Sequence, residues 1–168
     1  CGVPLVEPER VESLDLTVDG ADEVDSALRL IKGGGGALLR EKIIAAASRH
    51  FVVIVDDSKI VDRLGAFPLP VEVTPFGYGL TAGRLYAALR AGGCQGTTLT
   101  QRESAPGTPF ITDGGNYIFD CACHSIPDPD MLADTLKRIT GVVEHGLFIG
   151  MARTVIVGKA KSAEVRER

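Results

Sequence analysis

Carboxylates, lysines and glycines between residues 15 and 59 are spaced in a way that suits chemistry on a small, oxygen-rich anion. Asp19 and Asp22 frame a turn that follows a predicted strand. Lys32 precedes four glycines, whose backbone amides are open to a ligand because no side chain shields them. Glu41 lies about one turn into the helix predicted after these glycines. A carboxylate can move protons, and ammonium groups and amides can stabilise an anion.

The glycine run, residues 33–36, leads directly into the predicted helix, so its amides would lie at the positive end of the helix dipole. The run contains neither the Walker sequence nor a G-x-G-x-x-G pattern, so it does not indicate a nucleotide. A flexible linker is the alternative, although linkers usually contain serine or other polar residues. The apolar segments on both sides favour an anion-binding loop.

Each of the other candidate residues also has a plain structural explanation. The D-G-A-D segment, residues 19–22, could be a turn held by its own aspartate side chains. Glu41 could be a solvated residue that suits the helix dipole, and Lys59 could be an ordinary surface lysine. The functional interpretation depends on proximity, because the first turns of the helix would face the strand ends that hold the aspartates.

The elements that would position these residues alternate between strand and helix. Apolar residues at every second position predict a strand over residues 14–19. A helix is predicted over residues 37–49, and residues 51–55 are all apolar, as in a parallel strand covered on both faces. The apolar stripe of the helix would be Leu39, Ile43, Ile44 and Ala47. This order predicts an α/β layer whose ligands bind at the carboxyl ends of parallel strands.

A second pattern begins after a connection over residues 62–70, where we expect a domain boundary. The order of predicted elements is β-α-β-β-α-β, as in a ferredoxin-like module. The strands are predicted at residues 71–74, 97–101, 110–112 with 117–121, and 142–149, and the helices at residues 80–91 and 128–139. Residues 113–116, Asp-Gly-Gly-Asn, predict a hairpin turn.

The expected fold is therefore α/β, with a Rossmann-like parallel layer and an inserted ferredoxin-like α+β small domain. We assign residues 1–67 and 150–168 to the α/β domain and residues 68–149 to the small domain. Residues 154–157 would add one more apolar strand to the parallel layer. The charged tail, residues 159–168, is expected to be frayed.

Composition narrows the function classes. The chain has 168 residues, of which 45% are hydrophobic, and a net charge of -4, so a nucleic-acid partner receives no electrostatic support. No apolar run reaches the ~20 residues of a membrane span, and no signal peptide is visible.

Four irregularly spaced cysteines fit free thiols of a reducing compartment, which predicts a cytoplasmic location. Cys121 to His124 could suggest zinc, but a second ligand pair is lacking, and nearby lysines argue against a magnesium cage at the aspartates.

Several segments together resemble the type A ribose-5-phosphate isomerases. They are DLTVDGADEVD, LIKGGGGALLREKIIA, VDDSK, LGAFPLPVEV, TDGGNYIFD and GVVEHGLFIGMA. The resemblance runs from about Leu5 to Gly158. It implies interconversion of D-ribose 5-phosphate and D-ribulose 5-phosphate in the pentose phosphate pathway, with no metal and no cofactor. The family's N-terminal strand, its glycine- and threonine-rich phosphate loop and the next helix are not matched, so we expect a fragment that could be inactive by itself.

The resemblance also implies roles for residues. Glu41 matches the general base of the family. The residues that match substrate-binding positions are Asp19, Gly20, Ala21, Asp22, Lys32, Gly33, Gly34, Gly35 and Lys59. For the reaction, Lys32 and the glycine amides would stabilise a cis-enediolate, and Asp19 or Asp22 would assist ring opening. Lys59 would contribute to phosphate binding.

Two other functions stay open. A non-catalytic sugar-phosphate sensor domain could keep the glycine loop and lose the base, although Glu41 and both aspartates are present and no DNA-binding helix pair is visible. A relative of the acyl- or CoA-transferases would use a glutamate as nucleophile. The expected partner is a small sugar phosphate, with no nucleic acid and no membrane. We expect a homodimer or homotetramer, with the exposed sheet face of the small domain as the interface.

Overall fold

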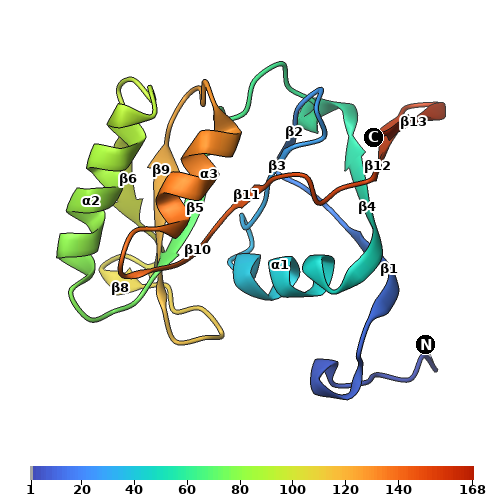
Figure 1. Cartoon of the computed structure of the whole chain (residues 1–168), viewed down its shortest axis with the longest axis horizontal. Helices are drawn as coiled ribbons and strands as arrows, with labels where there is room; N and C mark the ends of the chain where they lie inside the picture. Colours follow the sequence, from blue (N-terminus) through green and yellow to red (C-terminus); the bar gives the residue numbers. More distant parts are fainter. Residues whose placement is uncertain (1) are drawn as a thin grey trace.

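Three parallel strands form the sheet on which the candidate residues depend (Figure 1). In the computed structural model, which describes residues 2–168, β1 (Leu14–Asp19), β4 (Ser48–Asp56) and β12 (Thr154–Lys159) are parallel neighbours in the order β1-β4-β12. A fourth strand, β13 (Ser162–Glu167), pairs with β12 in the antiparallel direction. The predicted strand over residues 14–19 and the assignment of residues 154–157 to this layer are confirmed.

Two predictions for this layer are wrong: the frayed tail and the position at which the helix ends. The tail forms β13 instead of fraying, because it pairs with β12 along its length and Glu164 binds both Lys159 and Arg166. The helix predicted over residues 37–49 is α1 (Leu38–Ala46). It ends early because Ser48 already begins the parallel pairing with Leu14 of β1.

Burial in this layer also differs from the prediction. Helix α1 buries Leu38 and Ala45, whereas Ile43 of the predicted stripe is 54% exposed. Strand β4 was predicted to be covered on both faces, but Ile54 is 50% exposed. Leu16 of β1 lies on the same face of the sheet and is 56% exposed. The layer therefore buries one face only in this chain.

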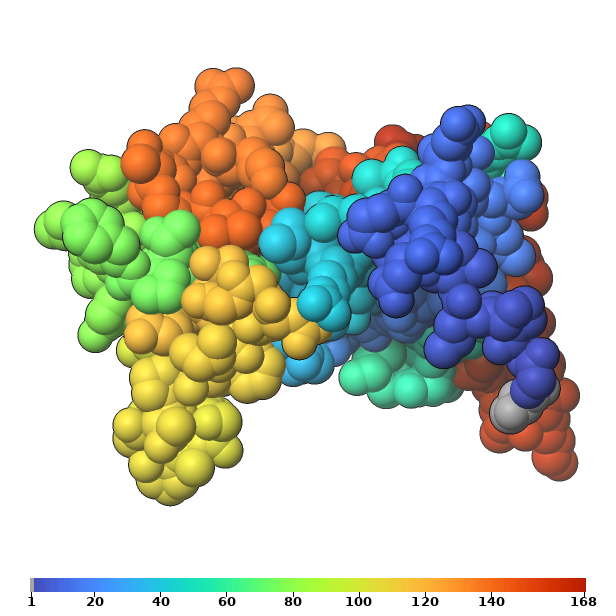
Figure 2. All heavy atoms as spheres, turned by 90° about the horizontal axis from the view of Figure 1, so that it is seen from below, coloured from blue at the N-terminus to red at the C-terminus, as the bar shows by residue number. Residues whose placement is uncertain are grey.

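The second part of the molecule is an antiparallel sheet with the strand order β10-β5-β9-β6, on which two mutually contacting helices pack (Figure 1). Its elements in chain order are β5 (Leu69–Val73), α2 (Tyr78–Ala91), β6 (Thr98–Gln101), β9 (Tyr117–Ala122), α3 (Pro129–Lys137) and β10 (Val142–His145). This is the predicted order of elements. Residues 110–112 form no strand, so the hairpin predicted to turn at residues 113–116 is wrong. The hairpin of this region is β7 (Glu103–Ala105) with β8 (Thr108–Pro109), which projects from the body in Figure 2.

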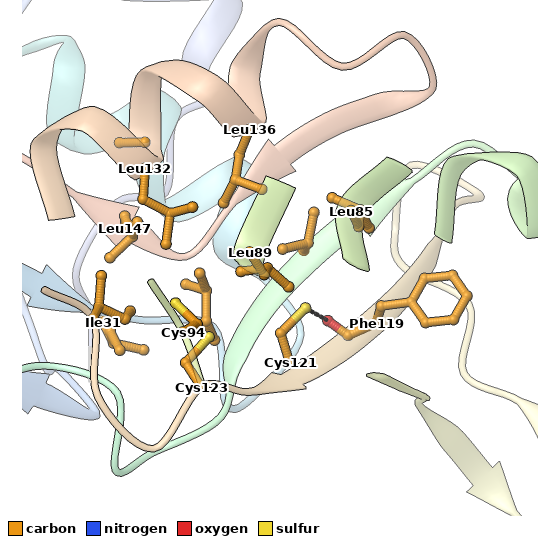
Figure 3. Close-up of a cluster of buried hydrophobic side chains, with 14 of the residues drawn as sticks. Ile31, Leu85, Leu89, Cys94, Phe119, Cys121, Cys123, Leu132, Leu136 and Leu147 are labelled. Carbon is orange, nitrogen blue, oxygen red and sulfur yellow. Dashed lines mark hydrogen bonds between the residues drawn. The ribbon is translucent and has the colours of Figure 1, made fainter. Parts of the chain in front are cut away.

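The core of this second part lies between its sheet and its helices (Figure 3). It extends beyond the sheet, because Ile31 and Leu147 belong to the same buried cluster. Cys94, Cys121 and Cys123 are buried in it, so these thiols serve as packing residues. Within residues 2–168, no helix combines the length and the apolarity that crossing a membrane requires.

A small sheet of the order β11-β3-β2 joins the two parts. It consists of β2 (Glu23–Val24), β3 (Leu30–Ile31) and β11 (Leu147–Phe148). Residues 142–149 were predicted as one strand, but the chain changes from one sheet to the other at Gly146. The amide of Gly146 donates to the carbonyl of Pro70 (2.8 Å), and its carbonyl accepts from the amide of Lys32 (2.9 Å). The crossover therefore ties Lys32 to the antiparallel sheet.

A buried ionic network fastens α1 to this crossover. Lys42 Nζ donates to Glu144 Oε1 (2.9 Å), to the carbonyl of His145 (2.6 Å) and to that of Leu147 (2.9 Å). Lys137 of α3 binds the other carboxylate oxygen of Glu144. Burial opposes ionisation of Glu144, but the hydrogen bonds from Lys137 and Lys42 outweigh it and lower the pKa of Glu144 to about 2. Burial, followed by the charge of Lys42, lowers the pKa of His145 to about 3.

The crossover glycine gives the first prediction. Gly146→Ala should lower the free energy of unfolding by about 1–3 kcal/mol or more, because a Cβ there would overlap the carbonyl oxygen of Lys32 and the ring of Pro70. The control is Gly83→Ala on the exposed side of α2, where nothing lies within 4 Å of the added Cβ. This control should raise stability by about 0.5–1 kcal/mol. Urea unfolding measures both, and an unchanged midpoint for Gly146→Ala would contradict the close approach.

The ionic network predicts loss of stability in acid. As the pH falls from 6.5 to about 3, the unfolded chain protonates His145 while the folded protein keeps it neutral. From 4.5 to about 2, the unfolded chain protonates Glu144 while the folded protein keeps it ionised. In both windows the unfolded state binds more protons, so the free energy of unfolding falls, by at most about 1.4 kcal/mol per pH unit for each group.

His145→Gln should flatten this dependence between pH 6.5 and 4.5, and Glu144→Gln should flatten it below 4.5. Urea unfolding at a series of pH values measures the slopes. The same slope in wild type and in His145→Gln above pH 4.5 would show that the imidazole does not titrate differently in the two states.

Candidate functional site

Lys32 is the centre of the candidate site. It follows β3, and its side chain is 4% exposed. Nζ donates to the carbonyl of Gly20 (2.6 Å) and lies 2.9 Å from Asp19 Oδ2 and 3.3 Å from Glu41 Oε2. A single buried ammonium group therefore brings together the end of β1 and the first turn of α1, which are far apart in the sequence.

Glu41 has one carboxylate oxygen without a protein donor. Its side chain is 26% exposed, yet Oε2 is buried and accepts no hydrogen bond from any of residues 2–168. The contact with Lys32 at 3.3 Å is an ion pair without hydrogen-bond geometry. Because no protein donor occupies this oxygen, its lone pairs can accept a proton from a bound molecule.

Asp22 holds the glycine loop from one side. Its Oδ2 accepts a hydrogen bond from the amide of Gly34 (2.8 Å). A Cβ on Gly34 would lie 2.8 Å from Asp22 Oδ1 and 3.1 Å from the ring of Phe67, so a larger residue would push the loop away from Asp22. Gly33 has a φ of 105° and Gly36 a φ of 89°, which residues with a side chain rarely adopt. The loop is therefore a fixed structure, and the linker alternative is wrong.

Arg102, which was not among the residues predicted from the sequence, holds the loop from the other side. Arg102 Nη1 donates to the carbonyls of Gly33 (3.0 Å) and Gly34 (3.1 Å), while Nε and Nη2 donate to Asp120. The sequence predicted a strand that ends at residue 101, so Arg102 fell in a predicted loop, and its opposite charge to Asp120 was the only signal. No motif singles out this pair, so the contact with the loop could not be predicted.

The candidate residues line one pocket of about 240 Å³. Its lining residues are Asp19, Gly20, Ala21, Asp22, Lys32, Gly33, Gly34, Gly35 and Glu41. Lys59 lines a neighbouring pocket of about 610 Å³ at the carboxyl ends of β4 and β12, and the two pockets share Gly20 and Ala21. The structure thus gathers all predicted site residues except Lys59, which lies next to them.

The chemistry of the pocket suits an anion better than a metal ion. The ammonium group of Lys32 already lies between the carboxylates of Asp19 and Glu41. Within residues 2–168, no group of three or more histidine, cysteine, aspartate or glutamate side chains is placed to hold a metal ion. What the pocket offers is a buried ammonium, a carboxylate without a donor, and backbone amides.

Sequence comparison relates the chain to one enzyme family. Residues 1–162 match the family described as ribose 5-phosphate isomerase A (phosphoriboisomerase A). The ribose-5-phosphate isomerase A of Maricaulis maris is 55% identical, over 99% of this chain and 72% of the relative. That of Parvibaculum lavamentivorans is also 55% identical, over 99% of this chain and 71% of the relative.

Solved structures share the fold. The ribose 5-phosphate isomerase A of Neisseria gonorrhoeae superimposes with a TM-score of 0.87 and 40% identity, covering 98% of this chain and 69% of that one. A D-ribose-5-phosphate isomerase in complex with phospho-erythronic acid gives a TM-score of 0.90 and 37% identity, covering 99% of this chain and 70% of that one. The resemblance inferred from the motifs is confirmed, and the chain belongs to the ribose 5-phosphate isomerase A family and has its isomerase function.

Proposed function

We propose that the pocket around Lys32 is the active centre of this isomerase, with Glu41 as its single base. The reaction converts D-ribose 5-phosphate into D-ribulose 5-phosphate, a step of the pentose phosphate pathway. One carboxylate can remove a proton from C2, leaving a cis-enediolate, and return the proton to C1. The observation that carries this role is the buried Oε2 of Glu41, which has no hydrogen-bond donor among residues 2–168 and lies 3.3 Å from the ammonium of Lys32.

Lys32 is proposed to stabilise the enediolate oxygen. An ammonium group has three N–H donors. One of them is taken by the carbonyl of Gly20, and the contacts of the ammonium group with Asp19 (2.9 Å) and Glu41 (3.3 Å) are ion pairs without hydrogen-bond geometry. A substrate oxygen that accepts one of the remaining N–H groups on the side of Glu41 would lie next to the base as well. Such a donor gains most in strength as negative charge develops on that oxygen.

Asp22 is the better candidate for the proton transfer that opens the sugar ring. Both oxygens of Asp19 are engaged, Oδ1 by the amide of Gly20 (2.7 Å) and Oδ2 by Lys32 (2.9 Å). In Asp22, Oδ2 accepts from Gly34, whereas Oδ1 has no donor among residues 2–168. A carboxylate oxygen without a donor can take up the ring hydroxyl proton and deliver it to the ring oxygen.

The ligand is proposed to be a sugar phosphate that spans both pockets. One related structure contains phospho-erythronic acid, a sugar phosphate analogue. In this chain the carbon chain would lie between Glu41 and the glycine loop, and the phosphate would extend past Gly20 towards Lys59. A lysine ammonium in an open pocket suits a phosphate dianion. The proposed chemistry uses no metal and no cofactor.

The wider organisation also remains a proposal. We propose that residues 1–67 and 150–168 form a Rossmann-like layer and residues 68–149 a ferredoxin-like domain, which the strand order β10-β5-β9-β6 supports.

Homodimers or homotetramers are proposed to form through the small domain. All five residues of the central strand β5 are buried, so the sheet face offers little apolar surface for an interface. More apolar surface is exposed on α2 and on the loop before it, where Leu80 is 77% and Phe76 is 95% exposed. Buried free thiols fit a cytoplasmic location.

Removal of the proposed base is the central test. Glu41→Gln should lower kcat by about 10²- to 10⁴-fold while phospho-erythronic acid still binds, because glutamine keeps the shape of the side chain and loses the proton acceptor. Glu12→Gln on the surface is the matched control. Ketose formation from ribose 5-phosphate measures turnover. Near-normal turnover of the glutamine variant would remove Glu41 from the mechanism.

Lys59 should affect binding more than chemistry. Lys59→Ala should raise KM by about 10- to 100-fold with little change in kcat, because a phosphate contact is the same in the ground state and in the transition state. The exposed Lys161→Ala serves as control. Steady-state kinetics separates the two parameters, and a fall in kcat with an unchanged KM would assign Lys59 to the reacting end of the sugar instead.

A further inference from the structure

Arg102 lines neither of the two pockets, yet it holds the loop that forms one of them. Its side chain is 14% exposed. Nη1 donates to the carbonyls of Gly33 (3.0 Å) and Gly34 (3.1 Å), and the carboxylate of Asp120 takes up Nε and Nη2. The guanidinium group thus bridges a carboxylate of the antiparallel sheet and two consecutive peptide groups of the glycine loop.

The geometry of the peptide group fixes where the loop amides point. In a planar trans peptide, the carbonyl of one residue and the amide of the next point in opposite directions. The carbonyls of Gly33 and Gly34 both point at Arg102, so the amides of Gly34 and Gly35 point to the opposite side. The amide of Gly34 meets Asp22 there, which confirms this direction. The amide of Gly35 has no partner among residues 2–168, and Gly35 lines the pocket with Glu41.

We propose that Arg102 is a positioning residue that aims the Gly35 amide into the pocket, as a donor to the negative charge that develops on the substrate. This role rests on the proposed function of the pocket. The Asp120 carboxylate fixes the plane of the guanidinium, and the carbonyls of Gly33 and Gly34 then fix the two peptide planes. A backbone amide held in this way needs no reorganisation when the charge appears.

The charge of Arg102 adds to the effect of its geometry. A cation at the carbonyl end polarises the peptide group, so the amide at the other end becomes a stronger donor, and this cooperative effect is larger where water is excluded. Phe110 supports the same arrangement at the end of the loop, because a Cβ on Gly36 would lie 2.5 Å from its ring. The antiparallel part thus contributes to the site without touching the ligand.

Two ligands distinguish this role from a merely structural one. Phospho-erythronic acid carries a carboxylate where the enediolate charge develops, and ribitol 5-phosphate carries uncharged hydroxyl groups there. Arg102→Gln should weaken binding of phospho-erythronic acid by about 10- to 100-fold and that of ribitol 5-phosphate by less than about 3-fold, since only the first ligand requires the aimed amide. It should also lower kcat more than it raises KM.

Arg102→Lys keeps the charge but not the planar guanidinium group, so its loss of affinity for phospho-erythronic acid should lie between that of wild type and that of Arg102→Gln. Asp120→Asn keeps the guanidinium group but removes the carboxylate charge that holds it in place. It should therefore weaken the binding of phospho-erythronic acid more than that of ribitol 5-phosphate. Arg84→Gln, on the exposed side of α2, is the control and should change nothing. Calorimetric titration measures the affinities, and circular dichroism checks that each variant is folded.

The outcomes separate this proposal from the one on which it rests. Equal weakening of both ligands in folded Arg102 and Asp120 variants, or no weakening of either, would overturn the role of Arg102. If Arg102→Gln does not fold, Arg102→Lys and Asp120→Asn decide in the same way. A wild-type chain that binds neither ligand, or a Glu41→Gln variant with normal turnover, would instead overturn the proposed function of the pocket.

Discussion

The buried ammonium group of Lys32 is the constraint that organises this molecule. An unpaired charge inside a protein costs several kcal/mol, so the fold must bring acceptors to it. The carbonyl of Gly20 accepts a hydrogen bond from it, and the carboxylates of Asp19 and Glu41 form ion pairs with it. The backbone amide of Lys32 donates in turn to the carbonyl of Gly146. The end of β1, the start of α1 and the crossover from the antiparallel sheet to the small sheet must therefore be in place together. Stability and the candidate site depend on the same contacts.

The ring of Phe148 connects this centre with the ionic network on the other side of α1. Lys32 Nζ lies 5.6 Å from the ring centroid and Lys42 Nζ lies 4.8 Å from it. An aromatic face attracts a cation, so one ring can stabilise both ammonium groups while separating them. Glu41 and Lys42 are neighbours in the sequence, and α1 directs one to the pocket and the other to Glu144. Fixing Lys42 therefore also fixes the rotation of the helix that presents Glu41.

The sequence predicts the features that depend on local chemistry, and it does not predict those that depend on a distant partner. The D-G-A-D turn, Lys32 and Glu41 could be placed at one end of a sheet, because alternating apolar residues and a glycine run mark the ends of elements directly. The exposed side of α1 was predicted wrongly, since the covered face of a helix is decided by what packs against it. The tail strand β13 was missed because its stability comes from pairing with β12. Arg102 was missed for the same reason, as its contacts with the glycine loop are made to backbone carbonyls, which leave no signal in residue types.

The four glycines illustrate how a local signal acquires its meaning only in three dimensions. A glycine run suggests flexibility, because glycine loses more conformational freedom on folding than any other residue. Here three of them are required by close contacts: a Cβ would meet Leu38 at Gly33, Asp22 at Gly34 and the ring of Phe110 at Gly36. At Gly35 alone nothing lies within 4 Å of the added Cβ. The absence of side chains therefore allows close approach to the protein at three positions, and at the fourth it leaves Gly35, which lines the pocket, open.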